Sequence, residues 1–164
     1  MAWYVVYTKS RSEKKVNKEL IDKGYSSYLP IIKTMKQWSD RKKKVEQPLI
    51  PGYVFVNTNQ TYFTKILQIS GVVNFVKFNK LPARVRDVDI ENIKILLRET
   101  EHVSVTNQQF TKGEEVLISD GKFKGFKGII DYQRGKSSLV LSLLELGMSI
   151  KVEIPVEHIN QLKK

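Results

Sequence analysis

The residues of this sequence with the clearest chemical potential are cations rather than catalytic groups. Residues 1–45 hold 12 Lys and Arg against 4 Asp and Glu, so most of the net charge of +11 is N-terminal. A localised basic face attracts polyanions such as nucleic acid or an acidic protein surface, and it can equally serve solubility. The candidate nucleic-acid-binding cations are Lys9, Arg11, Lys14 and Lys18, together with Arg41, Lys42 and Lys43.

Catalytic and metal-binding sets are missing from the sequence. The chain has no cysteine, and its two histidines, His102 and His158, lie far apart in sequence. Thiolate metal sites and disulfides are therefore excluded, and paired histidine ligands are not indicated. The C-terminal glycines match neither common phosphate-binding motif. We expect neither an enzyme nor a cofactor.

Length and composition set the scale of the fold. A chain of 164 residues with an apolar fraction of 41% can form one domain or two small ones with packed cores. No apolar run has the length of a membrane span, and the first residues lack the order of a signal peptide. We expect a cytoplasmic protein with no membrane contact.

The N-terminal cations are positioned by a predicted strand, helix and hairpin. Residues 3–7 are apolar on both faces, as in a central strand. Ser10 and Glu13 have the spacing of a capping box, which predicts a helix from there to about Lys23. Residues 25–48 are extended on both sides of a charged turn at 39–44, which predicts a hairpin with a basic tip.

A second organising feature is the turn at Pro51-Gly52 and the strand that follows it. Alternation places Tyr53 and Phe55 on one face of this strand, and the ordinary interpretation is that both faces are core. A short helix after Asn59, a strand at 72–78 and a helix from Asp87 or Asp89 complete the pattern. This pattern of strands and helices therefore predicts that residues 1–100 form an α+β sandwich with a mainly antiparallel sheet.

The last third of the chain changes character. Residues 101–109 are polar and aperiodic, which indicates a linker. Residues 110–164 hold short β-branched runs separated by glycine-containing turns, which predict a small β-barrel. Residues 138–146 are rich in leucine, which favours helix, but the alternation in 150–154 favours strands, and we expect the strand form.

Two motifs carry a resemblance to a known family. Pro51-Gly52-Tyr53-Val54-Phe55, about 50 residues after an opening Trp-Tyr-Val-Val, resembles the N-terminal domain of the NusG family. The segment 113–128 resembles the KOW motif, an SH3-like barrel element, of the same family. The matching KOW residues are Gly121, Phe123, Gly125, Phe126 and Gly128.

The resemblance implies a function and a set of partners. A NusG-like chain would bind the clamp coiled coil of RNA polymerase and suppress pausing or termination. It could also contact non-template DNA or nascent RNA, and recruit a ribosomal protein or termination factor through its KOW domain. The chain looks closer to the specialised UpxY and RfaH factors than to the general one, so the resemblance implies a specialised factor, with the general factor as the alternative, and we expect a monomer. The implied polymerase contacts are Tyr7, Tyr53 and Phe55, with a second contact at Tyr62, Phe63 and Thr64.

One alternative explains the same charge and the same barrel. A KOW-barrel RNA-binding or ribosome-associated protein with a basic accessory domain would also have an N-terminal excess of cations. In that case the strand after Pro51-Gly52 would be ordinary core.

Overall fold

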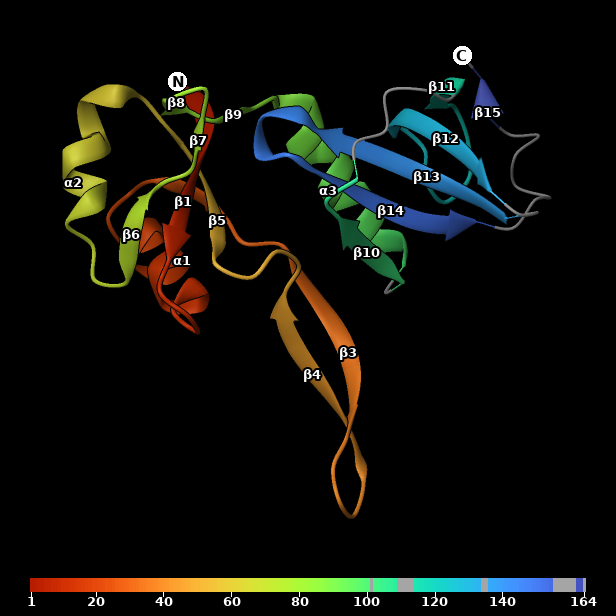
Figure 1. Cartoon of the computed structure of the whole chain (residues 1–164), viewed down its shortest axis with the longest axis horizontal. Helices are drawn as coiled ribbons and strands as arrows, with labels where there is room; N and C mark the ends of the chain where they lie inside the picture. Colours follow the sequence, from red (N-terminus) through yellow and green to blue (C-terminus); the bar gives the residue numbers. More distant parts are fainter. Residues whose placement is uncertain (101, 109–113, 134–135, 155–161, 164) are drawn as a thin grey trace. The chain divides into compact units, whose positions relative to one another are not determined.

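The chain is described by a computed structural model that covers residues 1–100, 102–108, 114–133, 136–154 and 162–163 (Figure 1). It divides into two compact units, Met1–Asp87 (unit 1) and Val88–Lys164 (unit 2). This division falls after the first residue of the helix Asp87–Glu99, whereas the first domain is predicted to end at residue 100. Residues 101 and 109–113, at the edges of the predicted linker and the start of the predicted barrel domain, lie outside the described residues, as does His158.

Unit 1 is built on a five-stranded antiparallel sheet whose strand β1 (Ala2–Thr8) has partners on both sides. The order along the sheet is β2 (Ser26–Tyr28), β5 (Tyr53–Thr58), β1 and β6 (Val72–Phe75), and β9 (Arg84–Val85) also pairs with β1. The predicted central strand at residues 3–7 is confirmed, because β1 is paired and buried along most of its length.

One face of this sheet carries the core of unit 1. Helices α1 (Glu13–Asp22) and α2 (Phe63–Leu67) cover it, and Leu20 of α1 and Ile66 of α2 are fully buried in one cluster with Val6 and Val54 of the sheet. Burying a side chain of this size contributes about 1.5–3 kcal/mol. The apolar cluster therefore holds both helices on the same face.

Helix α1 begins later than the predicted capping box requires. Its N-cap is Ser12 rather than Ser10, and no side chain caps it. Arg11, just before, has a φ of 63°, in the left-handed region, so the chain turns ahead of the helix. The first backbone bond of the helix runs from the Val16 N–H to the Ser12 carbonyl over 2.9 Å. At the other end Gly24 adopts a φ of 91°, as expected for a residue after a helix.

The predicted hairpin forms a separate two-stranded sheet. Its strands β3 (Ile31–Gln37) and β4 (Lys42–Pro48) are antiparallel and extend away from the five-stranded sheet (Figure 1). The Trp38 N–H donates to the Arg41 carbonyl over 2.7 Å, which leaves Ser39 and Asp40 at the tip. The smaller elements of unit 1 are a 3-10 turn at Gln60–Tyr62 and the strands β7 (Lys77–Phe78) and β8 (Leu81–Pro82).

Unit 2 contains a six-stranded antiparallel sheet in the order β10-β14-β13-β12-β11-β15. The bounds are β10 (Val103–Thr106), β11 (Glu114–Ile118), β12 (Lys127–Gln133), β13 (Lys136–Leu143), β14 (Met148–Ile154) and β15 (Leu162–Lys163), with a 3-10 turn at Leu144–Leu146. The α+β class with mainly antiparallel sheets is confirmed. Closure of this sheet into a barrel stays a prediction.

In unit 2 the structure confirms the strand predicted for the leucine-rich run and corrects the predicted linker. The leucine-rich run forms strand β13, as expected, and alternate leucines such as Leu139 and Leu141 are buried. The predicted linker over 101–109 is corrected, because strand β10 lies inside it. Val103 and Val105 of β10 pair with Val152 and Ile150 of β14, so these polar-flanked valines add an edge strand to the sheet.

Helix α3 (Asp87–Glu99) is fastened to the sheet of unit 2 by one asparagine. Asn92 is 1% exposed and lies beside the buried Ile93 and Leu96. Its Nδ2 donates to the Lys127 carbonyl over 2.8 Å, and its Oδ1 accepts the Lys127 N–H over 3.1 Å. The side chain therefore satisfies the backbone of one β12 residue as a neighbouring strand would.

We expect Asn92→Ala to lower the free energy of unfolding by about 1–3 kcal/mol, because it removes two part-buried hydrogen bonds to the Lys127 backbone, each of which contributes about 0.5–1.5 kcal/mol. Urea denaturation followed by circular dichroism measures the change. Lys94→Ala, on the exposed side of the same helix, is the matched control and should change stability little. An unaltered transition in Asn92→Ala would contradict this role of the asparagine.

Candidate functional site

The sheet face opposite the core of unit 1 carries the aromatic residues predicted to form a contact patch. Strand alternation places Val5 and Tyr7 of β1 on this face with their cross-strand partners Phe55 and Tyr53 of β5. The rings of Tyr7 and Tyr53 meet edge to face, with their centroids 6.0 Å apart and their planes at 84°. Tyr7 is 47% exposed and Tyr53 is half-buried. We refer to these two residues as the tyrosine pair.

Gly52 sets the position of the tyrosine pair. Its φ is 83°, and a Cβ at this residue would lie 2.9 Å from a carbon of the Tyr7 ring. Its carbonyl accepts the Thr8 N–H over 2.8 Å, which joins the turn to β1. Glycine is therefore needed twice, once for the backbone conformation and once for the close approach of the Tyr7 ring.

Phe55 does not belong to the exposed part of this face, so its prediction as a contact residue is corrected. Its side chain is 0% exposed, although strand alternation places it beside Tyr53 and Tyr7. Its ring meets the edge of Tyr28, which lies opposite it on β2, at a centroid distance of 6.4 Å. Phe55 therefore acts as packing beside the tyrosine pair.

The second predicted contact lies where the 3-10 turn runs into α2. Tyr62 is 40% exposed and Thr64 is exposed, as a contact surface requires. Phe63 is half-buried instead: its ring stacks on Phe75 at 4.0 Å and meets Tyr4 edge to face at 4.9 Å. The three neighbours thus divide into two exposed side chains and one anchor that fixes them to the core.

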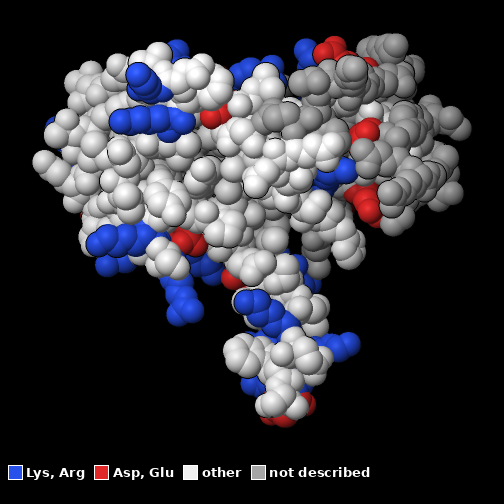
Figure 2. Space-filling view, viewed as in Figure 1, with Lys and Arg blue, Asp and Glu red and all other residues white. Residues whose placement is uncertain are grey.

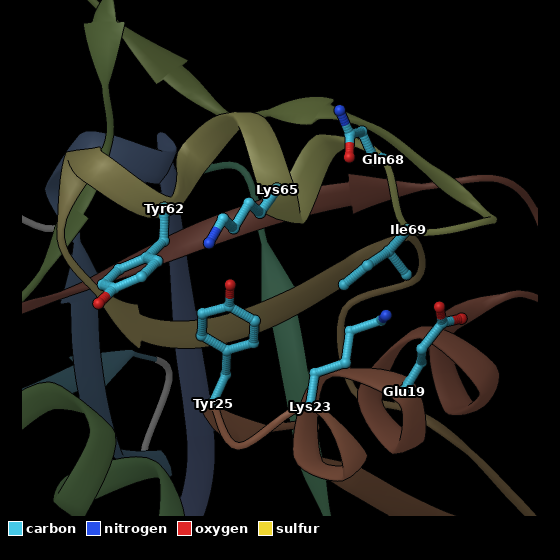
Figure 3. A pocket seen from close by; sticks show the side chains of 7 residues that line it. All are labelled: Glu19, Lys23, Tyr25, Tyr62, Lys65, Gln68 and Ile69. Atoms are coloured by element: carbon cyan, nitrogen blue, oxygen red, sulfur yellow. The ribbon is translucent and has the colours of Figure 1, made fainter.

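A pocket of about 740 Å³ opens beside Tyr62, between α1 and α2 (Figure 3). The Tyr25 and Tyr62 rings meet edge to face at 6.0 Å, and the Lys65 Nζ lies 5.7 Å from the centre of the Tyr62 ring. Sequence reasoning missed this pocket, because its walls come from segments about 40 residues apart that carry no shared motif. The residues that line it are Glu19, Lys23, Tyr25, Tyr62, Lys65, Gln68 and Ile69.

The cations of the first helix are exposed, but two of them face carboxylates. The Lys18 Nζ lies 2.8 Å from Asp22, and the hydrogen bond and charge of that carboxylate raise the pKa of Lys18 above its ordinary value. The Lys14 Nζ lies 3.8 Å from Glu46 of strand β4. Lys9 and Arg11 precede the helix and are also exposed. All four predicted cations are therefore exposed, and the charges of Lys14 and Lys18 are partly offset by the carboxylates they face.

The hairpin carries the second group of predicted cations. Arg41, Lys42 and Lys43 are all exposed around its tip. Figure 2 shows Lys and Arg side chains on both sides of the projecting hairpin, with acidic side chains at its end. The sequence 31–48 holds six Lys or Arg and two Asp or Glu, so this hairpin alone carries a net charge of +4.

The glycine-containing motif of unit 2 forms the turn between β11 and β12. Gly121 and Gly125 have φ values of 83° and 93°, and Phe123 is half-buried. Phe126 is fully buried. A Cβ on Gly128 would lie 2.6 Å both from the Phe126 ring and from the Val140 carbonyl oxygen. The spacing of these residues therefore serves the packing of one aromatic ring against a tight turn.

The candidate sites contain aromatic and cationic side chains rather than metal ligands. Within the described part of the chain, no three His, Asp or Glu side chains gather where they could hold a metal ion. Nor does any described helix have the length and apolarity needed to cross a membrane. The arrangement is suited to binding another macromolecule through exposed rings and charges.

The different burial of Tyr53 and Phe55 leads to a stability prediction. Phe55→Ala should lower the free energy of unfolding by about 3–5 kcal/mol, as truncation of a buried aromatic residue does. Tyr53→Ala should cost much less, because part of its ring is already in water. Thermal unfolding of both variants compares them directly. Equal, small effects would contradict the assignment of Phe55 to the packing.

Comparisons with known proteins agree with the motifs. A family model described as transcription termination factor NusG matches residues 1–94, more than half of the chain. The chain is 29% identical to the transcription termination/antitermination protein NusG of Borreliella burgdorferi, over 98% of each protein. It is 30% identical to the protein of the same name from Chlamydia trachomatis, over 86% of this chain and 85% of that protein. A solved structure of Thermotoga maritima NusG is 25% identical and covers 99% of this chain and 96% of that one, with a TM-score of 0.48. By its family match and its relatives, the chain belongs to the NusG family.

Proposed function

We propose that this chain is a transcription elongation and antitermination factor that binds RNA polymerase through unit 1 and suppresses pausing or termination. The observation that carries the proposal is the tyrosine pair, an exposed aromatic contact on the sheet face away from the α1–α2 core. Exposed aromatic side chains are frequent anchors of protein interfaces. Family membership and the names of the relatives support the same role.

In this proposal the tyrosine pair contacts the clamp coiled coil of the polymerase, and Tyr62 with Thr64 makes the second contact. Gly52 holds Tyr7 in place before the partner arrives, so little side-chain entropy is lost on binding. Phe55 and Phe63 contribute indirectly, by holding the exposed rings in position.

Unit 2 has a separate role in the proposal. It carries the KOW-like residues in its β11–β12 turn, and as a whole domain it recruits a further protein such as a ribosomal protein or termination factor. The relatives carry the name of the general factor, and specialisation of the UpxY or RfaH kind stays a prediction.

A second candidate function is that of an RNA-binding or ribosome-associated protein. Lys122 and Lys124, both exposed on the β11–β12 turn, favour it. It gives no role to the exposed tyrosine pair. Salt dependence separates the two, because binding through many phosphates weakens steeply as salt rises, whereas an aromatic-centred interface does not.

We expect Tyr7→Ala and Tyr53→Ala each to weaken binding to purified RNA polymerase by about 30-fold, the effect of losing an interface anchor worth about 2 kcal/mol. Affinity measured by fluorescence anisotropy of the labelled protein tests this. Phe78→Ala is the matched control, because Phe78 is 43% exposed on another part of unit 1. Loss of binding in the control as well, or unchanged binding in both tyrosine variants, would contradict the proposed contact.

The cations on the first helix and just before it lead to a separate prediction about nucleic acid. The double variant Lys9→Gln/Arg11→Gln should weaken binding to a single-stranded oligonucleotide and flatten its salt dependence by about 0.7 in slope for each phosphate that is no longer neutralised. Lys14→Gln/Lys18→Gln removes the same charge but should have a smaller effect, because Glu46 and Asp22 already face those lysines. A slope unaltered in both variants would mean that these cations only solubilise the protein.

A further inference from the structure

The hairpin of unit 1 combines an exposed indole with cations on a single face. Residues directly opposite each other in the ladder share a face, and Lys36 lies opposite Lys43. The Trp38 N–H bond to the Arg41 carbonyl continues the ladder, so Trp38 and Arg41 follow on the same face, two residues nearer the tip. Trp38 is 53% exposed, and the three cations are exposed around it.

The opposed lysines and the exposed tryptophan do not stabilise the free hairpin. Like charges directly opposite each other on a strand pair are destabilising, and Lys36 and Lys43 are such a pair. A half-exposed tryptophan at a tip buries little of its apolar surface. Both features become favourable when an anion lies between the ammonium groups and a planar group covers the indole.

Single-stranded nucleic acid has the chemistry that meets both needs. Its phosphates pair with Lys and Arg, and its bases stack on exposed aromatic rings. Duplex bases are already stacked on one another, so a duplex can use the cations but not the indole. The net charge of +4 over residues 31–48 favours a polyanion over a neutral peptide partner.

We propose that the tip of the β3–β4 hairpin binds single-stranded nucleic acid, with a base stacked on Trp38 and the adjoining phosphates held by Lys36, Arg41 and Lys43. The inference rests on the proposed function, in which the factor works beside nucleic acid, and it adds the class of ligand and the residue that selects it. The opposite face of the hairpin, which carries Met35 and the predicted cation Lys42, takes no part.

Tryptophan fluorescence tests the proposal on the full chain. Trp3 is the other of the two tryptophans, so Trp3→Phe leaves Trp38 as the sole indole. Titration with an oligothymidine of about 12 nucleotides, within the usual site size of such proteins, should quench Trp38 to saturation. A duplex of equal length should quench it far less. Equal quenching by both nucleic acids would overturn the proposal.

Variants measured by anisotropy of a labelled oligothymidine separate stacking from charge. Trp38→Ala should lower affinity by about 5- to 150-fold, the range expected for loss of one stacked base, and Trp38→Phe should keep most of the affinity. Met35→Ala, which removes an apolar side chain 61% exposed on the other face, should have no effect. Unaltered affinity in Trp38→Ala, or an equal reduction in Met35→Ala, would overturn the stacking contact.

The contribution of Lys36 and Lys43 to phosphate binding is tested against a second pair of lysines as the control. Lys36→Gln/Lys43→Gln should weaken oligothymidine binding and reduce its salt dependence. Lys77→Gln/Lys80→Gln makes the same change in net charge on the small β7–β8 hairpin. This control pair should leave both the affinity and its salt dependence unchanged. Equal reductions in affinity in both pairs would mean that only total charge matters, and would overturn the assignment of the phosphates to the tip.

A final experiment tests whether the hairpin tip binds an anionic membrane instead of nucleic acid. An indole beside cations also suits the interface of an anionic membrane. A blue shift of Trp38 with phosphatidylglycerol vesicles, without quenching by oligothymidine, would overturn the proposal in favour of lipid. None of these measurements uses polymerase, so their failure leaves the test of the tyrosine pair unaffected.

Discussion

The close approach of Gly52 to the ring of Tyr7 is the constraint on which unit 1 depends. The turn at Gly52 returns the chain so that β5 runs back along β1, and the Thr8 N–H bond to the Gly52 carbonyl fixes where that pairing begins. A slip of one residue in β5 would turn its side chains to the opposite faces of the sheet, because β1 is also paired with β6 and β9. Val54 and Val56 would then leave the core, and Tyr53 would enter it. The glycine thus determines which aromatic residues meet water.

The two faces of this strand pair differ in their exposed residues, because α1 and α2 close one face, whereas the other combines the buried Val5 and Phe55 with the tyrosine pair. The core face is filled by aliphatic side chains with close to no exposure, and this packing makes the sheet a rigid support. The other face holds the tyrosine pair beside buried Phe55. A binding surface built on a packed sheet keeps its geometry without a partner, which is why the exposed rings can serve as anchors.

The helices and strands could be predicted from the sequence more reliably than the tertiary contacts between them. Periodicity located α1, α2, α3 and the strand after Gly52, because each has its own apolar spacing. Alternation placed Phe55 on the same face as Tyr53 but could not tell which of them is covered, since burial depends on elements distant in the chain. Asn92 shows the same limit: a polar residue on an apolar stripe suggests solvent, yet it satisfies the backbone of Lys127. The pocket between Tyr25 and Tyr62 also arises only from tertiary packing.

The hairpin differs from the rest of unit 1 in how its order is maintained. A two-stranded ribbon outside a larger sheet is marginally stable in water, and opposed lysines weaken this one further. The pair between Lys14 and Glu46 anchors only its base, and both side chains are more than half exposed, so that contribution is small. A polyanion at the tip would therefore use part of its binding free energy to order the ribbon. Affinity at the tip should consequently be modest and strongly dependent on salt, which suits a contact that must be released as a polymerase advances.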